Sequence, residues 1–251
     1  MTIHIDTSYS LIPPYVVMIV LACALGIGVQ YILNIKRGAD KKTAGFVALL
    51  SPFMSIFFGL LLTYAASGGK AIGLSSIGGL AGMYGSVITL ALITGDKEKS
   101  KLMLENCTLV LPMMYSVSKL GCLFAGCCHG RPYSGPFCIE YTGKVTETGC
   151  VFPVQLSETV IFMLIFAAGC LMFAKGRKGV VYVVFIASAA AKGLLDITRE
   201  SHIGKIFSLN QVLCMLMIVA CIALLAVRKR KNGKAGEMKA LPVCEGKACL
   251  W

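Results

Sequence analysis

Apolar runs of about 20 residues recur along the chain, and shorter polar segments separate them. A helix rises about 1.5 Å per residue, so about 20 apolar residues cross the roughly 30 Å of hydrocarbon in a bilayer. Backbone groups in lipid must be hydrogen-bonded within the protein, so these runs are expected to be helices. The pattern predicts an all-α integral membrane protein with a bundle of about seven transmembrane helices. The expected spans are 11–35, 44–66, 72–94, 102–127, 155–174, 179–198 and 207–227.

The distribution of Lys and Arg predicts the orientation of these spans. Most of the 24 basic residues lie after the first, third and fifth spans and in the tail that follows the last one. Cytoplasmic loops are enriched in Lys and Arg, so the N-terminus is predicted outside and the C-terminus in the cytoplasm. The net charge of +12 reflects this sorting and does not require a nucleic-acid partner. We expect one membrane domain over 1–227 and a basic, disordered cytoplasmic tail over 228–251.

Several ionisable residues fall inside the apolar runs. Lys119 comes late in the fourth span, about 25 Å from its start at Leu102, which is the level of the outer headgroups. Lys192, Asp196 and Arg199 follow at helical spacing in the sixth span and are expected on one face of it. Long basic side chains near a helix end can snorkel to the interface, but two cations with an acid favour a polar cavity. Cations at this depth suit a lipid phosphate.

A glycine-rich stretch, "SSIGGLAGMYGS", spans 75–86. Gly78, Gly82 and Ser86 are spaced by four residues, a pattern that allows close packing of helices. Packing does not account for Tyr84. Its ring could anchor the helix at the interface, or its hydroxyl could point into the cavity.

Five cysteines gather at the end of the fourth span and in the loop after it. They are Cys122, Cys127, Cys128, Cys138 and Cys150. The outer side is normally oxidising, so disulfides are expected. A bond between the adjacent Cys127 and Cys128 would be strained, so partners in the loop are favoured. Cys138 and Cys150 are expected to support the loop's structure.

Two other chemistries are open to these cysteines. A zinc site could use Cys127, Cys128, His129, Cys138 and Cys150, although their spacing matches no standard zinc finger. A redox relay would need a C-x-x-C pair or its equivalent, which the sequence lacks.

Five blocks, in order, resemble the prolipoprotein diacylglyceryl transferase family. "GGLAGMYGS" resembles its glycine-rich third helix, with Tyr84 where the family has His or Tyr. "SKLGCLFAGCCHGR" resembles its signature G-R-x-G-N-F-x-N-G-E-x-x-G-R. "FPVQLSE" resembles its H-P-x-Q-L-Y-E, "KGLLDITRES" the block that ends in an essential arginine, here Arg199, and "FSLNQVL" the entry to its last helix.

The chain also departs from the family pattern. Lys119 replaces the first arginine of the signature, Cys122 and Ala125 replace its two asparagines, and Cys127 replaces its glutamate. Phe152 stands where the family has histidine.

The resemblance implies a seven-helix enzyme of the bacterial cytoplasmic membrane with its active site toward the outer face. Such an enzyme moves a diacylglyceryl group from phosphatidylglycerol to the lipobox cysteine of a prolipoprotein, and glycerol 1-phosphate leaves. It implies catalytic roles for Arg199, Lys119 and Tyr84. Its implied substrate-binding residues are Arg131, Tyr15, Gln155, Glu158 and Gly130. The implied partners are phosphatidylglycerol, lipobox segments and membrane lipids, with no metal and no organic cofactor.

Two other functions fit the same residues. One is a membrane thiol–disulfide oxidoreductase that uses Cys127 and Cys128. The other is a non-catalytic lipid- or peptide-binding relative, since Lys119 keeps the charge of the family's arginine but not its two-pronged geometry.

Overall fold

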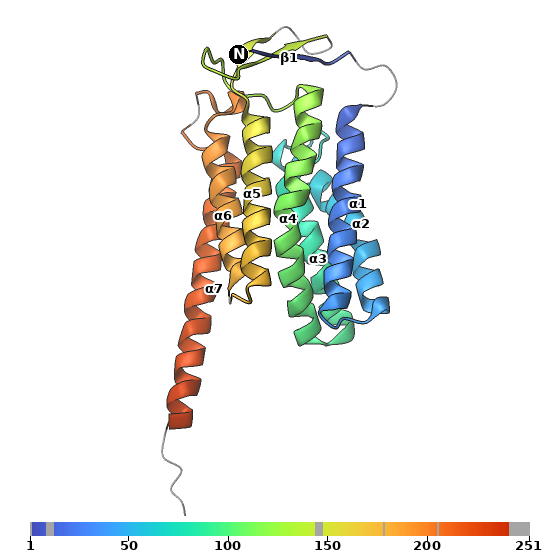
Figure 1. Ribbon diagram of the computed structural model, residues 1–251, viewed down its shortest axis with the longest axis vertical. Helices are drawn as coiled ribbons and strands as arrows, with labels where there is room; N and C mark the ends of the chain where they lie inside the picture. Colours follow the sequence, from blue (N-terminus) through green and yellow to red (C-terminus); the bar gives the residue numbers. More distant parts are fainter. Residues whose placement is uncertain (1, 9–12, 144–147, 178, 205, 241–251) are drawn as a thin grey trace, which may run out of the picture.

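The computed structural model describes residues 2–8, 13–143, 148–177, 179–204 and 206–240, without the side chains of 148 and 228–240. Within these residues, seven α-helices form an elongated bundle, which confirms all seven helical runs expected from the sequence (Figure 1). Their bounds are α1 Pro14–Lys36, α2 Lys41–Ala66, α3 Ser76–Thr94, α4 Lys97–Ala125, α5 Val154–Ala174, α6 Val180–Asp196 and α7 Leu209–Ala240.

Local capping explains several helix ends. Asp40, Ser75 and Asp96 precede α2, α3 and α4, and the side chain of each accepts a hydrogen bond from the backbone amide three residues on. These bonds satisfy amides that have no partner within the helix. Gly95 and Gly126 end α3 and α4 in the left-handed conformation that glycine adopts easily.

The helices have the length and polarity of membrane spans. Among the described helices, six are long and apolar enough to cross a bilayer, namely all except α6. With 17 residues, α6 is about 26 Å long. Large apolar side chains such as Leu49, Phe53 and Leu164 are exposed. Such a surface is suited to lipid, and the described part of the chain is therefore a mainly helical membrane protein.

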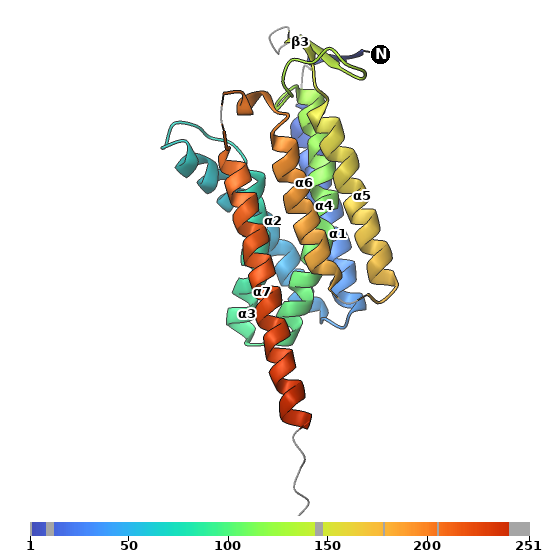
Figure 2. The same ribbon diagram turned by 90° about the vertical axis from the view of Figure 1, so that its left-hand side faces the viewer.

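Helix α4 is central to the packing of the bundle, and α7 packs against α6. α4 is the most buried of the six candidate spans and contacts α1, α3, α5 and α6. Figure 2 shows α2, α3 and α7 on one side of the molecule and α1, α4, α5 and α6 on the other.

The contact between α2 and α3 depends on the glycines. A Cβ at Gly82 would lie 2.2 Å from the carbonyl oxygen of Met54, and one at Gly78 would lie 2.3 Å from that of Phe58. The Oγ atoms of Ser86 and Ser51 are 2.9 Å apart across the same contact. The close packing predicted from the small-residue spacing is therefore present.

A small sheet, which the all-α prediction did not include, covers one end of the bundle (Figure 1). Its strands are β1 Ile3–Asp6, β2 Ile139–Thr142 and β3 Thr148–Val151. β1 pairs with β2 in parallel, and β2 pairs with β3 antiparallel. We call this end of the bundle the sheet end. Buried Ile139, Tyr141 and Val151 pack there against Leu123 of α4.

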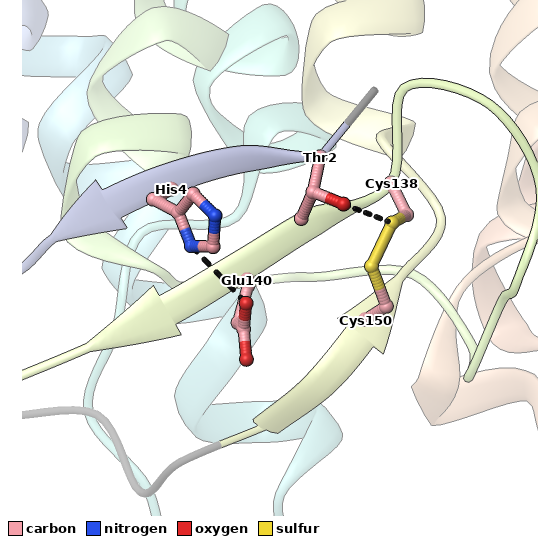
Figure 3. Close-up of a disulfide and its surroundings, with 5 residues drawn as sticks. All are labelled: Thr2, His4, Cys138, Glu140 and Cys150. Atoms are coloured by element: carbon pink, nitrogen blue, oxygen red, sulfur yellow. Dashed lines mark hydrogen bonds and ion pairs between the residues drawn. A yellow bond between two sulfur atoms is a disulfide. The ribbon is translucent and has the colours of Figure 1, made fainter.

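A disulfide between Cys138 and Cys150 joins the two ends of this hairpin (Figure 3). The Thr2 hydroxyl lies 3.7 Å from the Cys138 sulfur, and His4 Nδ1 lies 3.1 Å from a carboxylate oxygen of Glu140. The bond therefore belongs to the sheet, as expected of a structural pair.

Two helix ends differ from the sequence-based prediction. α6 ends at Asp196, so Arg199 is not on that helix but in extended backbone before a short 3-10 turn, Glu200–His202. α7 continues to Ala240, whereas the sequence predicted a disordered tail that begins at 228. Lys, Arg, Ala, Glu and Met are good helix formers, which explains the continuation. The rest of the predicted tail, 241–251, lies outside the described residues.

Candidate functional site

Glu158 is the centre of a buried polar cluster near the sheet end. It lies in the first turns of α5, and its side chain is 0% exposed. Its Oε2 is 3.1 Å from Lys119 Nζ, and its Oε1 is 2.6 Å from Arg199 Nη2. Tyr115 donates a hydrogen bond of 2.8 Å to Oε1. A buried carboxylate is costly unless it is paired, and here two cations and a hydroxyl pair it.

Tyr115 links the cluster to a third cation. The Nζ atoms of Lys119 and Lys192 lie 5.0 and 4.7 Å from the centre of its ring, and Lys192 donates to its hydroxyl at 2.9 Å. Both lysines are therefore held by cation–π contact. Tyr115 is not among the site residues predicted from the sequence. Its position four residues before Lys119, on the same face of α4, is the one local signal of this role.

Arg199 owes its position to the loop after α4 rather than to α6. Its backbone forms an isolated antiparallel bridge with Gly130, and the amide of Arg131 donates to the carbonyl of Thr198 at 2.9 Å. Burial disfavours the charge on Arg199, but the attraction and hydrogen bond of Glu158, together with Tyr115 and Cys128, outweigh burial and raise the pKa of the guanidinium. Arg199 is therefore a permanent cation held on extended backbone.

Asp196 supports Arg199 from the end of α6. One of its carboxylate oxygens lies 3.6 Å from Arg199 Nε. Ser208 and Asn210, at the start of α7, also donate to it.

Gly130 is required by packing. A Cβ there would lie 2.3 Å from the carbonyl oxygen of Phe152, and the amide of Phe152 donates to Arg131 at 3.0 Å. A side chain at 130 would push this segment away from Phe152 and disturb the bridge between Gly130 and Arg199.

A cavity of about 800 Å³ opens beside this cluster. Lys119, Arg199, Lys192 and Tyr15 line it near the sheet end, and mainly apolar side chains of α1, α2, α3, α6 and α7 line the rest. Its wall on α1 runs from Tyr15 to Ile27, which is about 18 Å along the helix. The cavity therefore combines a cationic end with a long apolar region.

Two hydroxyls in the cavity wall are available to a ligand. Ser55 and Ser188 line the cavity, and their buried Oγ atoms have no hydrogen-bond partner among the residues that the structure describes.

Three free cysteines converge on the same cavity. The sulfur atoms of Cys122, Cys127 and Cys128 all lie within 4.8 Å of one another. Hydrogen bonds from the thiols of Cys122 and Cys127 lower the pKa of the Cys128 thiol, and the charges of Lys119 and Arg199 act in the same direction. Among the described residues, these three thiols are a set of side chains close enough together to hold a metal ion.

The structure corrects two expectations about the loop cysteines. Cys127 and Cys128 are not bonded to partners in the loop, because Cys138 and Cys150 are bonded to each other. The zinc set that combined Cys127, Cys128, His129, Cys138 and Cys150 is wrong for the same reason. In addition, His129 Nε2 is engaged by Glu200 at 2.6 Å.

Three other predicted site residues, Tyr84, Arg131 and Gln155, bond to partners outside the Glu158 cluster. Tyr84 is not brought to it, since its hydroxyl lies 2.6 Å from that of Thr108 and its ring packs against Phe185. Arg131 is exposed and donates to the carbonyl of Ile197. Fully buried Gln155 donates to the carbonyl of Cys127 at 2.9 Å and to the hydroxyl of Tyr141 at 3.1 Å.

Comparison with known proteins yields one assignment. The family model described as "Prolipoprotein diacylglyceryl transferase" matches residues 9–227, which is most of the chain. No curated protein matches the sequence.

Proposed function

Because the chain belongs to the prolipoprotein diacylglyceryl transferase family, we propose that it transfers a diacylglyceryl group from phosphatidylglycerol to the lipobox cysteine of prolipoproteins. The observation that carries this proposal is the cavity with Lys119 and Arg199 at one end and apolar walls over the rest. A phospholipid has the same division, with an anionic phosphate and two acyl chains.

The orientation in the membrane is part of the proposal. The loops at the end opposite the sheet carry most of the basic residues before the tail, including Lys36, Arg37, Lys97 and Lys175. Positive loops stay in the cytoplasm, so the sheet end and the cationic end of the cavity face outward in the bacterial cytoplasmic membrane. The lipid and the lipobox segment then both approach from the outer leaflet.

The cations serve the leaving group in this mechanism. The acceptor sulfur forms a bond with the terminal glyceryl carbon of the diacylglyceryl group, and the bond from that carbon to the phosphate oxygen breaks. The phosphate keeps the electron pair and departs as glycerol 1-phosphate. Arg199 and Lys119 offer charge-assisted hydrogen bonds that strengthen as this negative charge develops.

Glu158 acts as a positioning residue in this mechanism. Its carboxylate contacts both cations, which would otherwise repel each other, and Tyr115 completes its hydrogen bonding. The cations are thus preorganised before the lipid arrives, which is the condition for strong electrostatic catalysis. Substrate contacts by Tyr15, Arg131, Gln155 and Gly130 remain part of the proposal. A catalytic hydroxyl on Tyr84 also remains part of it, although Tyr84 lies away from the Glu158 cluster and bonds to Thr108.

The test is lipidation of a lipobox peptide by the purified protein with phosphatidylglycerol, measured as the mass of the peptide. Losing one preorganised donor typically costs a factor of about 10²–10³ in rate, so Arg199→Ala is expected to be nearly silent. Lys119→Arg should retain activity, because it keeps the charge and adds the planar fork.

Controls separate this function from the two alternatives. Arg177→Ala, on the loop before α6 at the opposite end, should leave the rate unchanged. Near-normal lipidation by a double Arg199→Ala, Lys119→Ala variant would exclude this site. Thiol–disulfide exchange by the wild type without lipidation would favour the oxidoreductase, and neither activity would favour the binding protein.

A further inference from the structure

Three thiols meet at the point where α4 ends. Cys122 is in the last turn of α4, and Gly126 then reverses the chain with φ 66°. The reversal brings Cys127 back, so that its amide donates to the carbonyl of Cys122 at 3.2 Å. Cys128 follows with φ 55°, an unusual conformation for a residue with a side chain. The local fold therefore gathers three sulfur atoms from seven consecutive positions, 122–128.

The geometry of these sulfurs suits a thiophilic metal. Zinc–sulfur bonds are about 2.3 Å long, so three sulfur ligands of one zinc lie roughly 4 Å apart. The three sulfurs here all lie within 4.8 Å of one another, close to that arrangement. Thiolates select soft or borderline metals over magnesium or calcium.

We propose that Cys122, Cys127 and Cys128 form a zinc site whose fourth position faces the cavity and accepts the thiol of the lipobox cysteine. Three protein ligands with one open position are the arrangement of substrate-binding zinc, whereas structural zinc has four protein ligands. All three cysteines line the cavity together with Lys119 and Arg199. The second part of the proposal rests on the proposed function, which brings a thiol to this cavity.

The charges around the site are compatible with the ion. Three thiolates and a divalent cation carry one net negative charge, and Lys119 and Arg199 line the same cavity beside them. Cys128 is exposed, so a metal can enter.

The site would supply what the transfer reaction lacks, a means of ionising the acceptor. A thiol that binds zinc is deprotonated, and its proton passes to water. The sulfur would share one lone pair with zinc and retain others to attack the glyceryl carbon, and zinc itself would undergo no redox change. As the carbon–sulfur bond forms and the bond from carbon to the phosphate oxygen breaks, the sulfur would become a neutral thioether. It would then leave zinc, and water would take its place. This assignment replaces the expectation, drawn from the family resemblance, that no metal is needed.

The first experiment measures zinc in the full-length protein, purified in detergent without chelators. About one zinc per chain is expected, and cobalt exchanged into the site should give the strong near-ultraviolet absorption of sulfur-to-cobalt charge transfer. Cys122→Ser, Cys127→Ser and Cys128→Ser should each weaken metal affinity by more than about 100-fold, because even outer-shell changes cost 10- to 100-fold. Cys170→Ser, a half-buried cysteine of α5 away from the cavity, is the matched control and should keep the metal.

Since Cys122 is buried, its variant could lose metal by misfolding, so the exposed Cys128 provides the decisive substitution. Wild-type protein that binds neither zinc nor cobalt through sulfur would overturn the proposal. A disulfide among the three cysteines, detected by alkylation and mass measurement, would also overturn it.

The second experiment tests the open position. Adding a lipobox peptide to the cobalt protein should change the charge-transfer band, and a peptide with Ser in place of Cys should not. An unchanged spectrum with the Cys peptide would refute the acceptor role. Zinc-free protein that lipidates the peptide at the wild-type rate would also refute the acceptor role, but it would leave the proposed transfer intact. A zinc protein whose spectrum responds to the peptide but which never lipidates it would support the site and refute the transfer.

Discussion

Replacing Glu158 by Gln tests whether one buried carboxylate holds the cationic end of the cavity together. The change keeps the size of the side chain and an oxygen that can accept from Tyr115 and Arg199. It removes the charge that lies 3.1 Å from Lys119 Nζ and 2.6 Å from Arg199 Nη2. Both cations are buried, with side chains 8% and 9% exposed, so solvent cannot replace the lost charge.

The expected size of the effect follows from this burial. Removing one partner of a buried ion pair costs about 3–5 kcal/mol, because the other charge is left uncompensated. For a domain of this size, about 1 kcal/mol corresponds to roughly 2–4 °C in Tm. We therefore expect Tm to fall by about 6–20 °C for Glu158→Gln in thermal unfolding in detergent. Phosphatidylglycerol should restore part of this loss, since its phosphate can take the place of the carboxylate.

The matched control is Glu105→Gln. Glu105 makes a single pair with Arg37 at 2.9 Å, and their side chains are 30% and 27% exposed. Pairs of this kind contribute about 0–1 kcal/mol, so Tm should change by less than about 4 °C. Equal effects of the two substitutions, or a Glu158→Gln protein as stable as the wild type, would refute the argument.

Three further predictions concern the scaffold. Cys150→Ser should lower the free energy of unfolding by about 3 kcal/mol, because the disulfide closes a loop with a sequence separation of 12. Thermal unfolding should show this loss, while the initial lipidation rate at low temperature should change little. Gly82→Ala should lower Tm, because its Cβ would lie 2.2 Å from the carbonyl oxygen of Met54. The control, Gly45→Ala, has no atom within 4 Å of its Cβ and should raise Tm, because alanine favours helix more than glycine does. Equal shifts in Tm would contradict the packing role of Gly82. Reporter fusions after Lys41 and Lys99 should report the cytoplasm and one after Lys144 the outside, and a cytoplasmic result for Lys144 would refute the orientation.

The helices could be predicted because the bilayer leaves few alternatives for a long apolar run. The meeting of Lys119 and Arg199 in one polar cavity was also predicted, from their places along the fourth and sixth spans. The path of Arg199 could not be obtained in this way. It depends on a bridge to Gly130 in a distant part of the chain, whereas helical spacing alone suggested that the helix continues through it.

The remaining features were missed because short or aromatic patterns are ambiguous. β1 and β2 have four residues each, too few for a periodicity to be recognised. Tyr115 lies among apolar residues, where an aromatic ring is ordinary packing until its hydroxyl partners are known. The candidate metal ligands differ from the five predicted ones because the disulfide removes Cys138 and Cys150, and no spacing rule determines disulfide pairing.

The parallel pairing of β1 with β2 also sets an order of assembly. Ile3 lies opposite Ile139, so β1 has no partner until four helices have been synthesised after it. Chains are made from the N-terminus, and contacts between distant residues form late because a long loop must close first. β1 must therefore be on the same side of the membrane as the loop between α4 and α5 before the sheet can form. In the orientation proposed above, with the sheet end outside, β1 therefore has to cross the bilayer before the sheet can form.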